Sequence, residues 1–124
     1  MLNYQDSLER NLLRLEEIAN LEFDWNGYGA EPFFTSLVEK TKSIILELEF
    51  QPKIFPTAAN SIQLEYHSPD GSYFEVEVFE DGVSIMQVLG DDYDNAEFWE
   101  FGVDDVDEIR DLVNKFVSSY CGIF

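Results

Sequence analysis

Two stretches near the start of the chain place apolar residues at helical spacing. In the first, leucine and isoleucine recur every three or four positions, which predicts a helix over residues 6–21 with Asp6 as its N-cap. The second stripe predicts a helix that begins between residues 32 and 36 and ends before Pro52, because the residue before a proline disfavours the helical conformation. Ser36, with a glutamate three positions later, is spaced as a capping box at its start.

After residue 60 the apolar period changes from about 3.6 to two, which is typical of half-buried strands. Turn-forming residues separate the alternating stretches, and Pro69-Asp70-Gly71 and Asp81-Gly82 are the strongest of these signals. A last helical stripe follows Asp104 and Asp105, either of which can cap it. The expected strands are a short one at Lys53–Phe55 and longer ones over residues 61–67, 72–80, 83–89 and 96–101.

The resulting order is helix, helix, an antiparallel meander of four to five strands, and a C-terminal helix. This order predicts a single α+β domain over residues 1–124, in which helices cover one face of the sheet and water contacts the other. The last strand adds either Glu97, Trp99 and Phe101 or Phe98 and Glu100 to the solvated face, and the pattern leaves both settings open. On the first two long strands the expected solvated side chains are Gln63, Glu65, His67, Tyr73, Glu75, Glu77 and Phe79.

Charge changes this picture, because it is spread unevenly along the chain. The chain has 124 residues, with 26 Asp and Glu against 7 Lys and Arg, and its formal net charge is −19. Residues 1–60 hold 10 acids and 5 bases, whereas residues 61–124 hold 16 acids and 2 bases, so the two parts carry −5 and −14. No Lys or Arg occurs between Lys53 and Arg110. Solubility accounts for an acidic surface but does not require this exclusion of bases, which favours a surface that holds a cationic partner.

The acidity argues against direct contact with nucleic-acid phosphates or an anionic membrane, since both need basic patches. The apolar fraction of 45% is too high for a disordered acidic tail, so the chain is expected to fold around a core. The longest aliphatic run is three residues, far short of a membrane helix, and the N-terminus lacks a signal-peptide pattern. A single cysteine excludes an intramolecular disulfide, and the expected location is cytoplasmic.

The sequence contains no recognisable catalytic or metal-binding motif. His67 is the only histidine, so a metal site would need carboxylate or thiol ligands as well. The acidic loop Gly90–Asn95 fails the spacing of a calcium loop, because Ala96 and Glu97 stand where an acid and a glycine are required. Carboxylate pairs are too numerous in this chain to indicate a hydrolase. We therefore expect no cofactor, no metal and no enzymatic activity.

An unusual string lies between the first two helices, Asp24-Trp25-Asn26-Gly27-Tyr28-Gly29-Ala30. Its glycines permit positive φ, so the chain can turn sharply while Trp25 and Tyr28 fold back over the helix pair. We interpret Trp25, Asn26, Gly27, Tyr28 and Gly29 as a structural turn that fixes the angle between the helices. The alternative is a surface loop that presents Asp24, Asn26 and Tyr28 to a partner.

The same string resembles the signature of a family of small, mostly uncharacterised bacterial proteins, a Trp-Asp/Asn-Gly-x-Gly-Ala segment. In that family a leucine-rich helix precedes the segment, and a proline, a second helix, a Pro-x-Ile-x-Pro stretch and a Leu-Glu-aromatic strand follow it. The matching residues here are Trp25–Ala30, Pro32, Pro52–Pro56 and Leu64–Tyr66.

The resemblance covers most of residues 8–90, with two departures. Tyr66 stands where tryptophan is usual, and Ala58–Asn60 stands where a glycine-containing turn is usual. The family brings no established catalytic residues. The resemblance implies a prokaryotic protein from mobile or defence-linked gene neighbourhoods, of a toxin-neutralising kind.

Together these features favour a non-enzymatic binding protein that neutralises a basic protein, such as a toxin or nuclease encoded nearby, as an immunity protein or antitoxin does. One alternative is a nucleic-acid mimic that occupies the basic groove of a nuclease or DNA-binding protein, and a carboxylate-dependent hydrolase is a less favoured one. Carboxylates would steer and pair with the partner, and aromatic side chains would anchor it. The predicted partner-binding residues are Glu65, Tyr73, Glu75, Glu77, Phe79, Asp91, Asp92, Asp94 and Trp99.

Overall fold

The structure is a computed structural model, and it describes residues 4–121 of the chain. Besides its helices and strands, it has a short 3-10 turn at Tyr93–Asn95 and a π-helical turn at Val117–Cys121. The predicted α+β order of two helices, an antiparallel meander and a last helix is confirmed. The helices and strands are α1 (Tyr4–Ala19), α2 (Thr35–Leu46), β1 (Lys53–Pro56), β2 (Ile62–His67), β3 (Tyr73–Phe79), β4 (Gly82–Val88), β5 (Glu97–Phe101) and α3 (Val106–Phe116).

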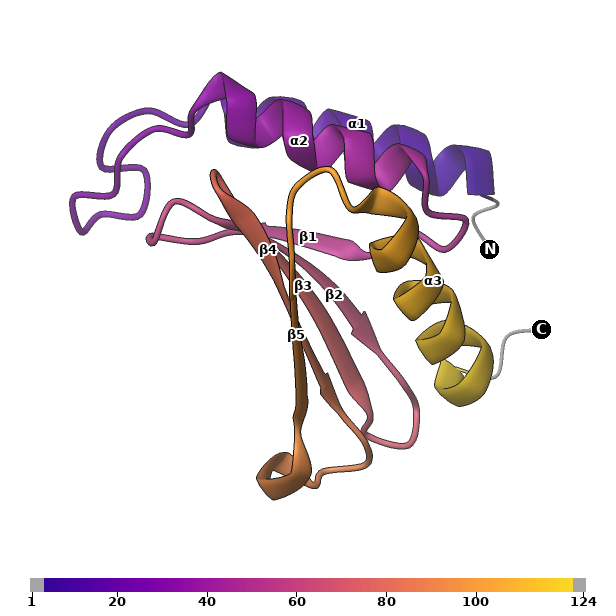
Figure 1. Cartoon of the computed structure of the whole chain (residues 1–124). Coiled ribbons are helices and arrows are strands. Elements are labelled where there is room, and N and C mark those ends of the chain that lie inside the picture. The colour runs from indigo at the N-terminus through magenta and orange to yellow at the C-terminus, as the bar shows by residue number, and fades with distance from the viewer. Residues whose placement is uncertain (1–3, 122–124) are drawn as a thin grey trace.

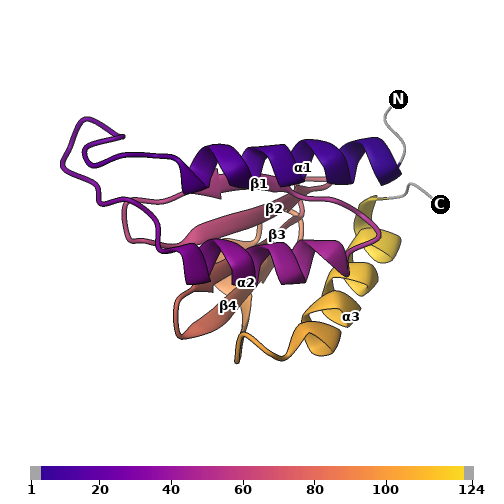
Figure 2. The same cartoon turned by 90° about the horizontal axis from the view of Figure 1, so that it is seen from above.

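The sheet is an antiparallel meander in the order β1-β2-β3-β4-β5, so each strand pairs with its neighbours along the chain. Directly paired residues of antiparallel strands point to the same face, and this register therefore sorts all side chains of the sheet into two sets. Figures 1 and 2 show α1 and α2 running antiparallel to each other across one face, with α3 beside them. We call the opposite face of the sheet the open face.

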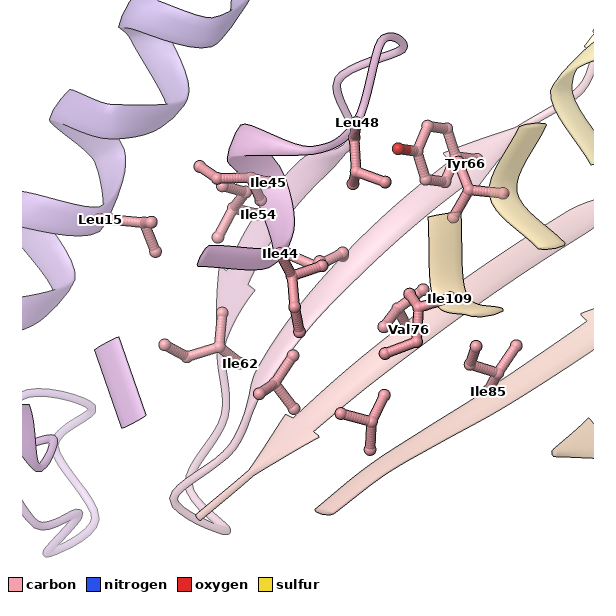
Figure 3. Close-up of a cluster of buried hydrophobic side chains, with 14 of the residues drawn as sticks. Leu15, Ile44, Ile45, Leu48, Ile54, Ile62, Tyr66, Val76, Ile85 and Ile109 are labelled. Carbon is pink, nitrogen blue, oxygen red and sulfur yellow. The ribbon is translucent and has the colours of Figure 1, made fainter. Parts of the chain in front are cut away.

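The core lies between the sheet and the three helices, and it is filled mostly by aliphatic side chains together with the fully buried Phe74 and Phe116. Ile44 of α2, Ile109 of α3 and Val76 of β3 are fully buried, and Figure 3 shows them pointing toward one another from the three elements. Along β2 and β3 buried residues alternate with half-buried or exposed ones, which is the period-two pattern of the sequence. Burying one such aliphatic side chain contributes about 1.5–3 kcal/mol relative to leaving it in water.

The helix starts differ from the sequence prediction. α1 begins two residues before Asp6, so Asp6 lies in the first turn, where its charge favours the helix dipole, and is not the N-cap. Phe34 precedes α2 without a side-chain cap, and the Ser36 hydroxyl donates to the carboxylate of Glu80 in the β3–β4 turn. A contact between distant parts of the chain has replaced the local cap there. Within residues 4–121, no helix has both the length and the apolar composition needed to cross a membrane.

Ile44→Ala is expected to lower the free energy of unfolding by about 2–5 kcal/mol, because it leaves a cavity among fully buried neighbours. Leu46→Ala, two positions further along α2, is the matched control, since Leu46 is 44% exposed and should cost under about 1 kcal/mol. Urea unfolding followed by circular dichroism measures both. Equal losses would contradict the burial of Ile44 beneath α2.

Candidate functional site

Three carboxylates lie close together on the open face. Glu65 of β2 is directly opposite Glu75 of β3, and Glu77 follows two positions along β3, opposite Gln63. We call Glu65, Glu75 and Glu77 the carboxylate cluster, and all three side chains are half-buried. Like charges directly opposite each other destabilise a sheet, by roughly 0.2–1 kcal/mol per pair. The sheet therefore holds an unfavourable arrangement of charge at its centre.

Hydroxyl groups, which carry no charge, stabilise two members of the carboxylate cluster. The Tyr73 hydroxyl donates to Glu75 Oε1 at 2.7 Å, and the Ser61 hydroxyl donates to Glu77 Oε2. Burial raises the pKa of the Tyr73 hydroxyl well above its usual value, and its hydrogen bond to Glu75 raises it further. Tyr73 therefore stays protonated and remains a donor, but it cannot neutralise the carboxylate that it contacts.

The third member, Glu65, has one salt-bridge contact among the described residues, and it is with His67. His67 Nε2 lies 3.2 Å from Glu65 Oε1, and this contact is an ion pair only when the imidazole is protonated. Lys53 of β1 is opposite Glu65 in the register, but the described side chains form no ion pair between them. Among the described side chains, only His67 forms a salt-bridge contact with the carboxylate cluster, so Glu75 and Glu77 have no cationic partner there.

The surroundings of Glu75 shift the pKa of its carboxyl. Burial raises the pKa of the Glu75 carboxyl above its usual value, the charges of Glu77 and Glu65 raise it further, and the hydrogen bond from Tyr73 acts in the opposite direction. A cation placed over this face would relieve both the repulsion and the loss of hydration. The carboxylate cluster is chemically suited to receive a Lys or Arg side chain.

Aromatic side chains lie around the carboxylate cluster, and one of them differs from the prediction. Phe98 and Glu100 of β5 pair with Met86 and Ser84, so they share the open face, and Phe98 is 69% exposed. Trp99 pairs with Ile85 and packs against the core on the helix side, so its predicted place on the partner-binding face is wrong. The half-buried Tyr73 and Phe79 lie on the open face as predicted.

The three predicted loop aspartates lie at one end of the sheet. Asp91, Asp92 and Asp94 are exposed in the connection between β4 and β5, at the bottom of Figure 1. The Gly90 N–H donates to the Ser72 hydroxyl at 2.9 Å, which joins this connection to the β2–β3 turn. These aspartates therefore extend the acidic surface beyond the strand ends.

The β2–β3 turn contributes a further acid to that end of the sheet. The pKa of Asp70 is lowered, first by the backbone N–H of Ser72 and then by the Ser68 hydroxyl, so Asp70 stays charged. Within the part of the chain that the structure describes, no group of three or more His, Cys, Asp or Glu is arranged to hold a metal ion.

The string between α1 and α2 forms a loop that is held by its own polar groups. Asn26 Oδ1 accepts from the Tyr28 N–H at 2.8 Å and from the Ala30 N–H at 3.2 Å. Asp24 Oδ1 accepts from the Gly29 N–H at 2.7 Å. Gly27 and Gly29 have φ of 79° and 82°, a region that favours glycine. The interpretation of these residues as a structural turn agrees with this geometry.

The two aromatic residues of the loop have different environments. The Trp25 indole N–H donates to the Glu31 carbonyl at 2.9 Å, and its ring lies 5.7 Å from that of Phe33, against the core. Tyr28 is 92% exposed, so the prediction that it folds back over the helices is wrong. Figure 1 shows the loop projecting beyond the sheet. Asp24 and Asn26 are occupied within the loop, and Tyr28 is the residue that it presents.

Comparisons with protein-family models, with curated proteins and with solved structures found no match to this chain. The family resemblance of the string Trp25–Ala30 therefore stays a prediction. The open face has to be interpreted from its own chemistry.

Glu75→Gln is expected to raise the free energy of unfolding at about pH 7 by a few tenths of a kcal/mol to about 1 kcal/mol. The pKa of Glu75 is higher in the folded than in the unfolded chain, so the charged carboxylate costs stability, and stability falls as pH rises above the usual value of 4.5. Glutamine still accepts the hydrogen bond from Tyr73. Urea unfolding at several pH values should show a weaker pH dependence in the variant, while Glu39→Gln at an exposed position of α2 should leave it unchanged. An equal pH dependence of stability in the two variants would contradict the raised pKa of Glu75.

Gly27→Ala is expected to lower the free energy of unfolding by about 1–2 kcal/mol, because alanine disfavours positive φ. An added Cβ at Gly27 meets no atom within 4 Å, so the cost is in the backbone and not in a clash. The neighbouring Tyr28→Ala should change stability by less than about 0.5 kcal/mol, since the ring is exposed. Thermal unfolding of the two variants measures the difference, and the reverse order would contradict the structural role of the loop.

Proposed function

We propose that this protein is a non-enzymatic binding protein that neutralises a basic protein partner through the open face of its sheet, as an immunity protein or antitoxin does. The carboxylate cluster is the observation that carries the proposal. Three carboxylates occupy neighbouring positions on two strands, with one histidine as a cationic contact among the described residues. This arrangement costs stability in the free protein, and a cationic partner would remove the cost.

The chemistry of the face around the carboxylate cluster supports a protein as that partner. Phe98 offers an exposed aromatic ring next to Met86, and aromatic residues and methionine are enriched at the centres of protein interfaces. Charged groups at the rim mainly steer the encounter and set its salt dependence, whereas buried aromatic anchors hold the complex. The partner surface should therefore combine Lys and Arg side chains with an apolar pocket.

The nucleic-acid mimic fits the distribution of charge less well. A mimic needs carboxylates spaced like phosphates along one face, but exposed acids also lie on α1 and α3, at Glu16 and Glu108 for example. The carboxylate-dependent hydrolase has weaker support. The structure has a solvent-open groove between α1 and β1, and Glu17 is the acid in its lining. The carboxyl with a raised pKa, Glu75, lies on the open face and does not line this groove.

The test is a binding measurement with the purified products of the genes beside this one. A small basic protein among them should bind, and its affinity should fall steeply as salt rises. The triple variant Glu65→Gln, Glu75→Gln and Glu77→Gln should weaken binding by at least about tenfold and flatten the salt dependence. Calorimetry at low and at physiological ionic strength measures both effects.

The control triple variant removes the same charge from helices, by Glu16→Gln, Glu39→Gln and Glu108→Gln. It should bind within about twofold of the unchanged protein if the open face is the contact surface, because exposed distant charges are screened. Failure of every neighbouring product to bind would overturn the proposal. Equal weakening by the two triple variants would show that net charge, and not the open face, governs binding.

A further inference from the structure

A solvent-open groove of about 620 Å³ runs between α1 and the edge strand β1. Figure 2 shows α1 lying alongside β1, and the groove follows the helix for three turns from Ser7 to Glu17. It lies at the β1 edge of the sheet and adjoins the carboxylate cluster at one point, because Lys53 is directly opposite Glu65.

The groove differs in charge from the rest of the molecule. It gathers Arg10, Arg14 and Lys53, three of the 7 basic residues of a chain with 26 acids. Glu17 is the only acid in the lining, so the groove carries a formal charge of +2, three bases minus one acid. Arg14 Nη1 lies 3.8 Å from Glu17 Oε1, whereas neither Arg10 nor Lys53 forms an ion pair within residues 4–121. Two cationic side chains are therefore available to an anionic ligand.

The backbone edge of β1 is already closed, which excludes strand addition as the way to fill the groove. Arg14 Nε donates to the Ile54 carbonyl at 3.3 Å, and Asn11 Nδ2 donates to the Pro52 carbonyl at 2.9 Å. Pro52 precedes the strand and Pro56 is its last residue, and neither has an N–H to offer. A ligand must therefore be recognised by the side chains of the groove.

Apolar side chains beside the cations indicate that the ligand has apolar groups as well as negative charge. Leu13 is 61% and Phe55 is 40% exposed, and both line the groove. A simple anion would leave these two side chains in water. Three helical turns span about 15 Å, which is the length of about four or five extended residues. The dimensions and the mixed lining both match a short peptide segment.

We infer that this groove binds an extended acidic peptide segment in which carboxylates alternate with apolar side chains. The carboxylates pair with Arg10 and Lys53, and the apolar side chains cover Leu13 and Phe55. Most acids of the chain do not prevent this, because charges further than a Debye length of about 8 Å are screened at physiological salt. Glu65, directly opposite Lys53, is the near acid that a bound peptide carboxylate has to tolerate. The protein would then carry two binding surfaces of opposite charge, and this second site does not depend on the function proposed for the open face.

The probe is a capped hexapeptide of alternating Glu and Leu, titrated into the isotope-labelled full chain and followed by amide chemical shifts. Shifts should be confined to residues 7–17 and 51–55 and absent from β3. The double variant Arg10→Gln and Lys53→Gln should bind the peptide at least about fivefold more weakly. The amide chemical shifts of the free variant outside the groove should match those of the unchanged protein. A matched double variant, Lys42→Gln and Lys115→Gln, makes the same charge change outside the groove and should bind as the unchanged protein does.

Three results would overturn the inference. The first is an absence of shifts in the groove amides, and the second is equal weakening by the two double variants. The third is that inorganic phosphate, at the same concentration as the peptide, shifts the groove amides equally, which would identify a site for simple anions. A peptide with Lys in place of Glu is the charge control and should leave the groove amides unshifted. Shifts that it causes in β3 would concern the open face alone, so the two proposals can fail separately.

Discussion

One-sided burial of the antiparallel sheet is the constraint on which the rest of this structure depends. A meander places its connections at the strand ends, and the helices before and after it pack on a single face. Leu64, Val76 and Ile85 occupy consecutive strands and are buried on that face. Because side chains alternate along a strand, fixing these residues inward fixes Glu65, Glu75 and their neighbours outward. The register that builds the core thus also builds the open face.

The open face carries like charges that destabilise the fold, and the fold forms in spite of them. Each carboxylate of the cluster costs little compared with the aliphatic burial on the other side of the same strands. The Tyr73 and Ser61 hydroxyls soften the repulsion without neutralising it. The local cost therefore persists in the native state, and it is the kind of cost that a partner can remove. The groove between α1 and β1, in contrast, has a net positive lining. It exists because α1 packs beside the edge strand.

The sequence predicted those features in which the local pattern decides. Period-two alternation placed Glu65, Tyr73 and Glu75 correctly, since a buried face leaves a strand only one register. It left the setting of the last strand open, because aromatic residues occupy both of its faces. Pairing with β4 decided this by setting Trp99 opposite Ile85. Local reasoning also failed at Ser36, where a contact with the distant β3–β4 turn replaced the expected cap.

By itself, then, the sequence determined the elements, their α+β order, the acidic character of the strands and the tight turn at Gly27. These follow from periodicity, charge and backbone conformation, which are properties of neighbouring residues. Only the tertiary structure decided that Phe98 and not Trp99 shares the open face, that Tyr28 projects into solvent, and that Arg10 and Lys53 line one groove. Arg10 and Lys53 are far apart along the chain, so no local pattern links them, and packing of α1 against β1 brings them together.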